Sequence, residues 1–184
     1  MVGYRKLTKE GNMGTRGLTV VIDENSDIKV AQYGQWDFYP SGQGLAALNF
    51  LRDSEKVANL KANLSKCRFI SDNEHIDIVN HVADSFGGMS LEASEEFGKL
   101  YPSLIRDTGA DILDVIANAD KEIPLIDNTD FANDEIFCEG VYTINFATNT
   151  FTAFFGDKQK QFHLDGLPTD EEFLNAMGDN LVLG

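Results

Sequence analysis

Strand patterns stand at both ends of this chain, and the region between them has helical periodicity. Residues 18–23 are β-branched and apolar, residues 24–27 are turn formers, and residues 28–33 alternate, which together predict a hairpin. Residues 136–146 and 151–155 predict two more strands around a short turn, and residues 161–164 are a candidate third strand. We therefore predict an α+β fold, in which the N-terminal hairpin and the C-terminal antiparallel strands share a sheet and a central helical segment lies between them.

The central segment contains several helix signals. Apolar residues recur at helical spacing over residues 45–51 and 57–64, and again from Ile76 to Phe86, where two glycines end the pattern. Residues 90–100 predict a further short helix. Thr108–Asp111 and Thr169–Glu172 both match the capping box that opens a helix. Among the 184 residues we expect a polar lead-in over residues 1–12 and a single domain over residues 13–184.

Charge is distributed unevenly along the chain, whose formal net charge is -15. Residues 1–68 contain ten Lys or Arg and seven Asp or Glu, a net charge of +3, whereas residues 69–184 contain five and 23, a net charge of -18. Such a field repels nucleic acid and favours a partner protein with a basic surface, although acidity also serves solubility. The candidate acidic surface consists of Asp111, Asp114, Asp120, Glu122, Asp127, Asp130, Asp134 and Glu135.

Known catalytic and metal-binding patterns are incomplete in this sequence. Gly42–Ala47 spells G-x-G-x-x-A, but a Pro-Ser turn precedes it in place of a buried strand, so a helix start is favoured over a dinucleotide site. His75 and His81 are six residues apart, which is not a zinc spacing, and residues 127–135 lack the glycine of a calcium loop. We therefore predict no metal and no cofactor.

Cellular location follows from the cysteines and the apolar runs. Cys67 and Cys138 have no CxxC partner and indicate reduced residues of a cytoplasmic protein. No apolar run approaches the about 18 residues of a membrane helix, and residues 1–17 do not read as a secretory signal.

One segment, Q32-Y-G-Q-W-D-F-Y-P-S-G-Q-G44, concentrates aromatic, glycine and glutamine residues and contains the single tryptophan. We interpret it as a tight corner in which Arg16 pairs with Asp37 and the two glutamines hydrogen bond across strands. The alternative is a binding cleft, for which the candidate residues are Arg16, Gln32, Gln35, Trp36, Asp37 and Tyr39. A hydrolase that frees Thr15 as an N-terminal nucleophile is a further alternative, because Thr15 follows Gly14 at the start of a predicted strand.

The same segment also carries a resemblance. T15-R-G-L18, followed by Q32-Y-G-Q-W-D-F-Y-P-S-G-Q-G44, resembles an uncharacterised family of phage and prophage proteins of Gram-positive bacteria. The segment C138-E-G-V-Y-T-I-N-F-A-T-N-T-F-T-A-F-F-G156 is similar to the second hairpin of that family. Phe38 stands where the family pattern implies a small residue, which makes the turn bulkier. The resemblance implies origin in a mobile element and implies no chemistry.

Charge and missing catalytic motifs together favour a binding function. We expect a non-enzymatic phage or mobile-element accessory protein, an inhibitor or decoy that binds a nucleic-acid-handling or defence factor of the bacterial host. A small ligand-binding domain or hydrolase with a site at the Arg16, Trp36, Asp37 and Tyr39 corner is one alternative. A virion-associated structural protein is another.

Overall fold

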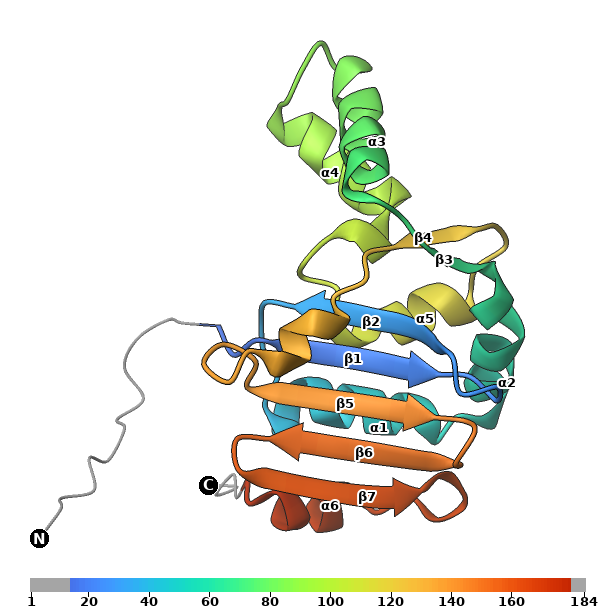
Figure 1. Cartoon of the computed structure of the whole chain (residues 1–184), viewed down its shortest axis with the longest axis vertical. Helices are drawn as coiled ribbons and strands as arrows, with labels where there is room; N and C mark the ends of the chain where they lie inside the picture. Colours follow the sequence, from blue (N-terminus) through green and yellow to red (C-terminus); the bar gives the residue numbers. More distant parts are fainter. Residues whose placement is uncertain (1–13, 180–184) are drawn as a thin grey trace, which may run out of the picture.

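The computed structural model describes residues 14–179, so the predicted lead-in, residues 1–12, lies outside the described residues. A five-stranded sheet with the order β2-β1-β5-β6-β7 forms the centre of the fold (Figure 1). Its strands are β1 (Gly17–Ile22), β2 (Ile28–Gly34), β5 (Gly140–Asn145), β6 (Thr150–Phe155) and β7 (Lys158–His163). Strands from both ends of the chain thus lie in one sheet, and the predicted α+β fold is confirmed.

Strand pairing in this sheet is mixed. The β1–β2 pair and the β5–β6–β7 strands are antiparallel, whereas β1 and β5 are parallel, with Gly17 opposite Gly140 and Ile22 opposite Asn145. A parallel pair requires a long connection between its strands. Here β2 returns the chain to the end of the sheet where β1 begins, and residues 35–139 lead from there to the start of β5.

Two C-terminal strand boundaries differ from the prediction. Strand β5 begins at Gly140 and not at residue 136, because the Asp134 carboxylate accepts hydrogen bonds from the backbone N–H groups of Ile136 and Phe137 at 3.1 and 2.9 Å and holds them in a turn. Strand β7 begins at Lys158, three residues before the predicted strand.

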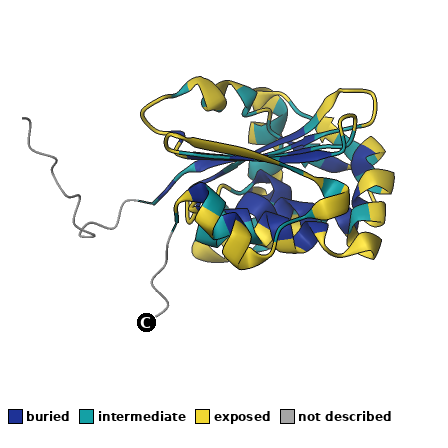
Figure 2. Ribbon diagram, turned by 90° about the horizontal axis from the view of Figure 1, so that it is seen from below, coloured by how far each residue is buried: buried dark blue, intermediate teal, exposed yellow. Residues whose placement is uncertain are grey.

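Four helices cover one face of the sheet (Figure 2). They are α1 (Leu45–Leu51), α2 (Ser54–Asn63), α5 (Ile112–Ala117) and α6 (Asp170–Met177). Alternation along each strand sends every second side chain toward these helices. The core between the two layers includes Val21, Val30, Tyr142, Ile144 and Phe151 from the strands and Leu48, Leu60, Ile112, Ile116 and Phe173 from the helices.

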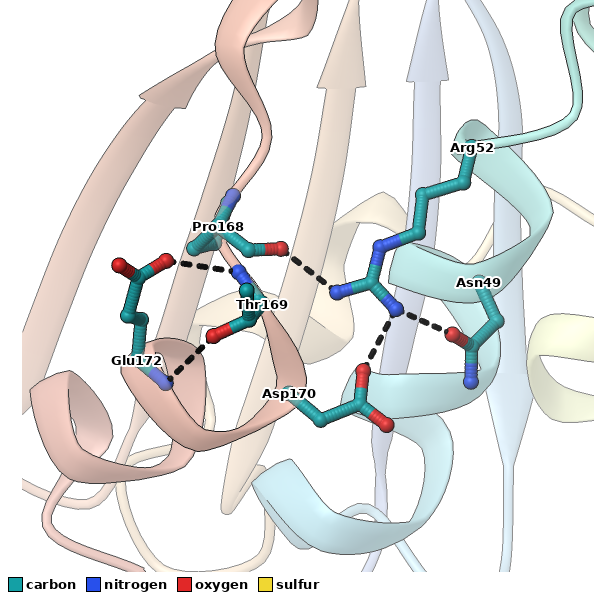
Figure 3. Close-up of polar contacts among 6 residues, drawn as sticks. All are labelled: Asn49, Arg52, Pro168, Thr169, Asp170 and Glu172. Atoms are coloured by element: carbon teal, nitrogen blue, oxygen red, sulfur yellow. Dashed lines mark hydrogen bonds and ion pairs between the residues drawn. The ribbon is translucent and has the colours of Figure 1, made fainter.

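Helix α6 begins at the predicted capping box and is fixed to α1 by one arginine (Figure 3). The Thr169 hydroxyl accepts the Glu172 N–H at 3.2 Å, and the Glu172 carboxylate accepts the Thr169 N–H at 2.8 Å. The Arg52 guanidinium donates to the Asp170 carboxylate at 2.5 Å and to the carbonyl of Pro168 at 2.6 Å. These contacts set the angle at which the last helix packs under the sheet.

The prediction of a capping box at Thr108–Asp111 is wrong. The buried Thr108 hydroxyl donates instead to the carbonyl of Pro102, and a 3-10 turn, η4 (Gly109–Asp111), leads into α5 without a side-chain cap. Thr108 is used to close the preceding loop, so it is not free to cap the helix.

Helices α3 (Asp72–Asp84) and α4 (Leu91–Leu100) form a hairpin that projects away from the sheet (Figure 1). Ser71 and Ser90 cap the two helices, and Gly87 and Gly88 adopt positive φ in the connection between them. A short parallel pair, β3 (Cys67–Phe69) with β4 (Ile123–Leu125), joins the hairpin to the body. Within residues 14–179, no helix is both long and apolar enough to cross a membrane.

Candidate functional site

The glycine-rich and aromatic segment after β2 forms a corner around Phe38. The Phe38 ring is fully buried and stacks on Tyr142 with the ring centroids 6.0 Å apart, and the Tyr142 hydroxyl donates to the Phe38 carbonyl at 2.8 Å. A Cβ at Gly17 would lie 2.3 Å from Phe38 Cδ1, and a Cβ at Gly34 would lie 2.1 Å from Phe38 Cε2. Glycine is therefore required at both positions, because their missing side chains make the space that the Phe38 ring occupies. The ring is part of the core and does not enlarge the exposed side of the turn.

The turn beyond Phe38 reverses the chain into α1. Asp37 has a φ of 61°, in the left-handed region, and its carbonyl accepts the Gln43 N–H at 2.8 Å. Residues Pro40–Gly44 then form one π-helical turn. The interpretation of this segment as a tight corner agrees with this geometry.

The expected Arg16–Asp37 ion pair is not formed within residues 14–179. The Arg16 guanidinium lies over the Phe137 ring, 4.7 Å from its centroid, and the backbone of Arg16 is bonded to Glu139, whose carboxylate accepts the Arg16 N–H at 3.0 Å. Pairing of β1 with β5 brings residues 137–139 beside Arg16, and no local pattern predicts that neighbour.

The two glutamines also differ from the expectation, because neither side chain hydrogen bonds to a neighbouring strand within residues 14–179. Gln32 is 5% exposed and its Nε2 donates to the carbonyl of Ile105 at 3.3 Å. Gln35 accepts the Tyr33 hydroxyl at 2.7 Å, and its N–H donates to the carbonyl of Arg106 at 2.9 Å. Both glutamines thus hold residues 105–107 against the edge of β2.

Trp36 and Tyr39 are both half-exposed, but their side chains contact different parts of the chain. Trp36 is 43% exposed, and its Nε1 donates to the Asp107 carboxylate at 3.0 Å. Tyr39 is 44% exposed and packs against Phe155 with the ring centroids 5.8 Å apart. The structure therefore brings Gln32, Gln35 and Trp36 together around residues 105–107, and it places Arg16 and Tyr39 against other partners.

A cleft of about 520 Å³ lies beside this corner, between the edge of β2 and the base of α3. Of the six candidate residues, Gln32 lines it. Sequence reasoning missed the other side chains around it, because they come from four separate segments. The lining residues are Gln32, Tyr33, His75, Ser103, Leu104, Ile105, Arg106, Asp107, Ile126 and Asn128.

Candidate nucleophiles lie in protected positions. Thr15 is 2% exposed, and its carbonyl accepts the Phe38 N–H at 3.1 Å, so its hydroxyl faces the interior in the described chain. Cys67 and Cys138 are free thiols, and burial raises the pKa of each to about 11, which keeps them protonated near neutral pH. No group of three or more His, Cys, Asp or Glu in residues 14–179 is placed to hold a metal ion.

The eight predicted acidic residues do not share one surface. Asp114 on α5 pairs with Lys56 at 2.7 Å, and Glu122 pairs with Arg68 at 2.9 Å. The carboxylates of Asp127 and Asp134 accept backbone N–H groups two or three residues ahead of them. Asp111, Asp120, Asp130 and Glu135 are exposed.

These residues also lie on opposite sides of the sheet. Asp111 and Asp114 belong to the helical layer, whereas residues 127–135 surround η5 (Thr129–Asn133) on the other face. Phe131 of η5 packs edge-on against Tyr33. Side chains alternate along β2, and Val30 packs in the core against the helices, so Tyr33, three positions further on, points to the opposite face.

A separate acidic surface is found on the α3–α4 hairpin. Residues 70–101 contain seven Asp or Glu and one Lys. Glu74 pairs with Arg68 at 2.6 Å, which lowers the pKa of its carboxyl, and Glu96 lies 3.8 Å from Lys99. The other five acidic residues are exposed, namely Asp72, Asp77, Asp84, Glu92 and Glu95. The sequence shows how many acidic residues this segment contains, but it does not show that the hairpin projects from the body.

In comparisons with known proteins, no family model, no curated protein and no solved structure matches the chain.

Proposed function

We propose that this chain is a non-enzymatic accessory protein of a phage or mobile element that binds a basic surface of a host nucleic-acid-handling or defence protein. The α3–α4 hairpin is its contact surface. The TRGL and QYGQWD resemblance supports the mobile-element origin, and the net charge of -15 supports a basic partner. The observation that carries the proposal is the combination of charge and exposed apolar side chains on the hairpin.

Apolar side chains cluster at the tip of the hairpin. Phe86, Met89 and Leu91 lie within six residues of each other and are 45%, 72% and 72% exposed. Phe and Met are enriched at protein interfaces, where an apolar centre is surrounded by a polar rim. Apolar residues exposed together at a projecting tip are typical of a surface that another protein covers.

The exposed acids supply the rim and the long-range attraction. Asp77 and Asp84 on α3 and Glu92 and Glu95 on α4 flank the tip residues in the sequence. A cluster of one sign speeds association with a surface of the opposite sign and disfavours nucleic acid itself. Apolar tip and acidic flanks together fit a protein surface that normally receives phosphates.

The test compares two variants that each lose three negative charges. The hairpin variant carries Asp77→Asn, Asp84→Asn and Glu95→Gln, and the matched control carries Asp120→Asn, Asp130→Asn and Glu135→Gln. Binding to a panel of purified basic nucleic-acid enzymes and defence factors of a Gram-positive host is measured from about 50 to 500 mM salt. We expect a complex that weakens steeply with salt, that the hairpin variant loses and that the control retains.

A second variant tests the apolar tip. Met89→Ser with Leu91→Ser should weaken the same complex without changing its salt dependence, because it removes buried contact area and no charge. Absence of binding across the panel, salt-insensitive binding, or equal losses in the hairpin and control variants would each refute the proposal.

A further inference from the structure

The cleft beside the corner has the size and lining of a small-molecule site. Its volume of about 520 Å³ falls within the range of ligand pockets, roughly 300–1,000 Å³. Tyr33, Ile105 and Ile126 are among its lining residues and supply apolar surface. Polar and charged residues of the same segments also line it, so the cleft offers both apolar and polar contacts.

Two amide side chains present unused acceptors to this cleft. Gln32 is 5% exposed, and its Nε2 donates to Ile105, but no donor within residues 14–179 reaches its Oε1. Asn128 donates through Nδ2 to the carbonyls of Ala31 and Ile126 at 3.2 and 3.3 Å, and its Oδ1 likewise accepts nothing from these residues. Both oxygens are open to solvent, and a ligand that carries N–H groups would replace water as their donor.

One positive and one negative side chain stand next to each other at the cleft. Arg106 makes no ion pair within the described part of the chain, and its carbonyl is held by the Gln35 N–H at 2.9 Å. Asp107 accepts the Trp36 indole N–H on Oδ1, which leaves Oδ2 without a partner among the same residues. The corner therefore fixes the backbone of Arg106 and the side chain of Asp107.

We propose that this cleft binds a small zwitterion, a free amino acid with an aliphatic side chain. Its carboxylate pairs with Arg106, and its ammonium donates to Asp107 and to the free amide oxygens of Gln32 and Asn128. Its side chain packs on the apolar lining residues Tyr33, Ile105 and Ile126. Because the ligand carries both signs, it suits adjacent cationic and anionic groups, whereas a phosphate ligand would face Asp107 and a polyamine would face Arg106.

The single tryptophan makes the test direct. Trp36 is bonded to Asp107, so occupation of the cleft should change its emission. The full chain is titrated with L-leucine, with N-acetyl-L-leucine, which lacks the ammonium, and with L-leucinamide, which lacks the carboxylate. None of the three absorbs at the tryptophan excitation wavelength, and calorimetry gives an independent reading. We expect saturable binding of L-leucine and about tenfold or greater weakening for each blocked compound.

Two variants assign the two ends of the ligand. Arg106→Gln should weaken L-leucine about tenfold and remove its advantage over L-leucinamide, whereas Asp107→Asn should remove its advantage over N-acetyl-L-leucine while keeping an acceptor for Trp36. Lys158→Gln, an exposed cation on β7, is the matched control and should change nothing.

Several outcomes would overturn this inference. They are no saturable signal for L-leucine at millimolar concentration, equal affinity for all three compounds, and wild-type affinity in Arg106→Gln. Circular dichroism of each variant confirms that the fold is retained, so that a lost signal reports the cleft. The cleft does not include the charge-neutralised residues of the hairpin, and the two proposals can therefore fail separately.

Discussion

Replacing Phe38 with alanine tests whether the corner is a structural element of the core. The ring is fully buried, and truncating a buried Phe to Ala costs about 3–5 kcal/mol through lost transfer energy and the cavity left behind. Gly17 and Gly34 face the ring and have no side chains that could move into the space, so we expect the upper half of this range. The stacking of Phe38 on Tyr142, worth about 0.5–1.5 kcal/mol, is also lost, which again favours the upper half of the range.

Urea unfolding followed by far-UV circular dichroism measures this cost. In a thermal melt followed by the same signal, with about 2–4 °C in Tm for each kcal/mol in a chain of this size, a loss of about 4–5 kcal/mol should lower Tm by about 8–20 °C. The dependence of unfolding free energy on urea should stay unchanged, because the exposed surface of the unfolded chain is the same.

A matched aromatic control separates burial from composition. Phe137 is 47% exposed and contributes a face to Arg16, so Phe137→Ala should cost within about 1 kcal/mol. If Phe38→Ala does not fold, Phe38→Leu, with an expected cost of about 1–3 kcal/mol, keeps the comparison measurable. A Phe38→Ala protein within about 1 kcal/mol of wild type would refute the structural interpretation of the corner.

Two further predictions concern the last helix and the thiols. Thr169→Ala removes the hydroxyl that accepts the Glu172 N–H and should destabilise the chain by about 1 kcal/mol, measured by the same urea titration, with Ser94→Ala, an exposed position on α4, as the comparison. Cys67 and Cys138, whose pKa values are raised to about 11, should have about a hundredfold smaller thiolate fraction at pH 8 than ordinary thiols and should react correspondingly slowly with iodoacetamide. The reaction should accelerate as pH rises toward 11 in the folded chain, and fast labelling at pH 8 would contradict the burial of these thiols.

Local patterns in the sequence predicted the elements that depend on neighbouring residues. Alternation and turn formers located the β1–β2 hairpin, and the reciprocal Thr169–Glu172 bonds follow from residues three positions apart. The same reasoning failed at Thr108, whose hydroxyl was already engaged by Pro102. A capping pattern predicts a helix start only when the capping side chain has no stronger partner.

Contacts between residues far apart in the sequence could not be predicted from local patterns. Nothing local indicates that β1 pairs in parallel with β5, and the expected Arg16–Asp37 pair fails because that pairing brings Phe137 to Arg16. The cleft depends on residues from β2, α3 and the segments around 105 and 127, which periodicity cannot place together. Composition makes Gln32 a candidate site residue, but its hydrogen bond to the carbonyl of Ile105, 73 positions away, is visible in the structure alone.

The parallel β1–β5 pair has a consequence for how the chain is made. Residues 17–22 emerge from the ribosome long before residues 140–145, so at about 5–20 residues per second one edge of the first hairpin waits for several seconds or more without its neighbour. Contacts this distant in sequence also slow refolding, since the intervening loop must close before any pairing energy is gained. During that interval the nascent hairpin offers an open strand to any other chain, and we expect the yield of native protein to depend on synthesis rate and on chaperones that shield such edges.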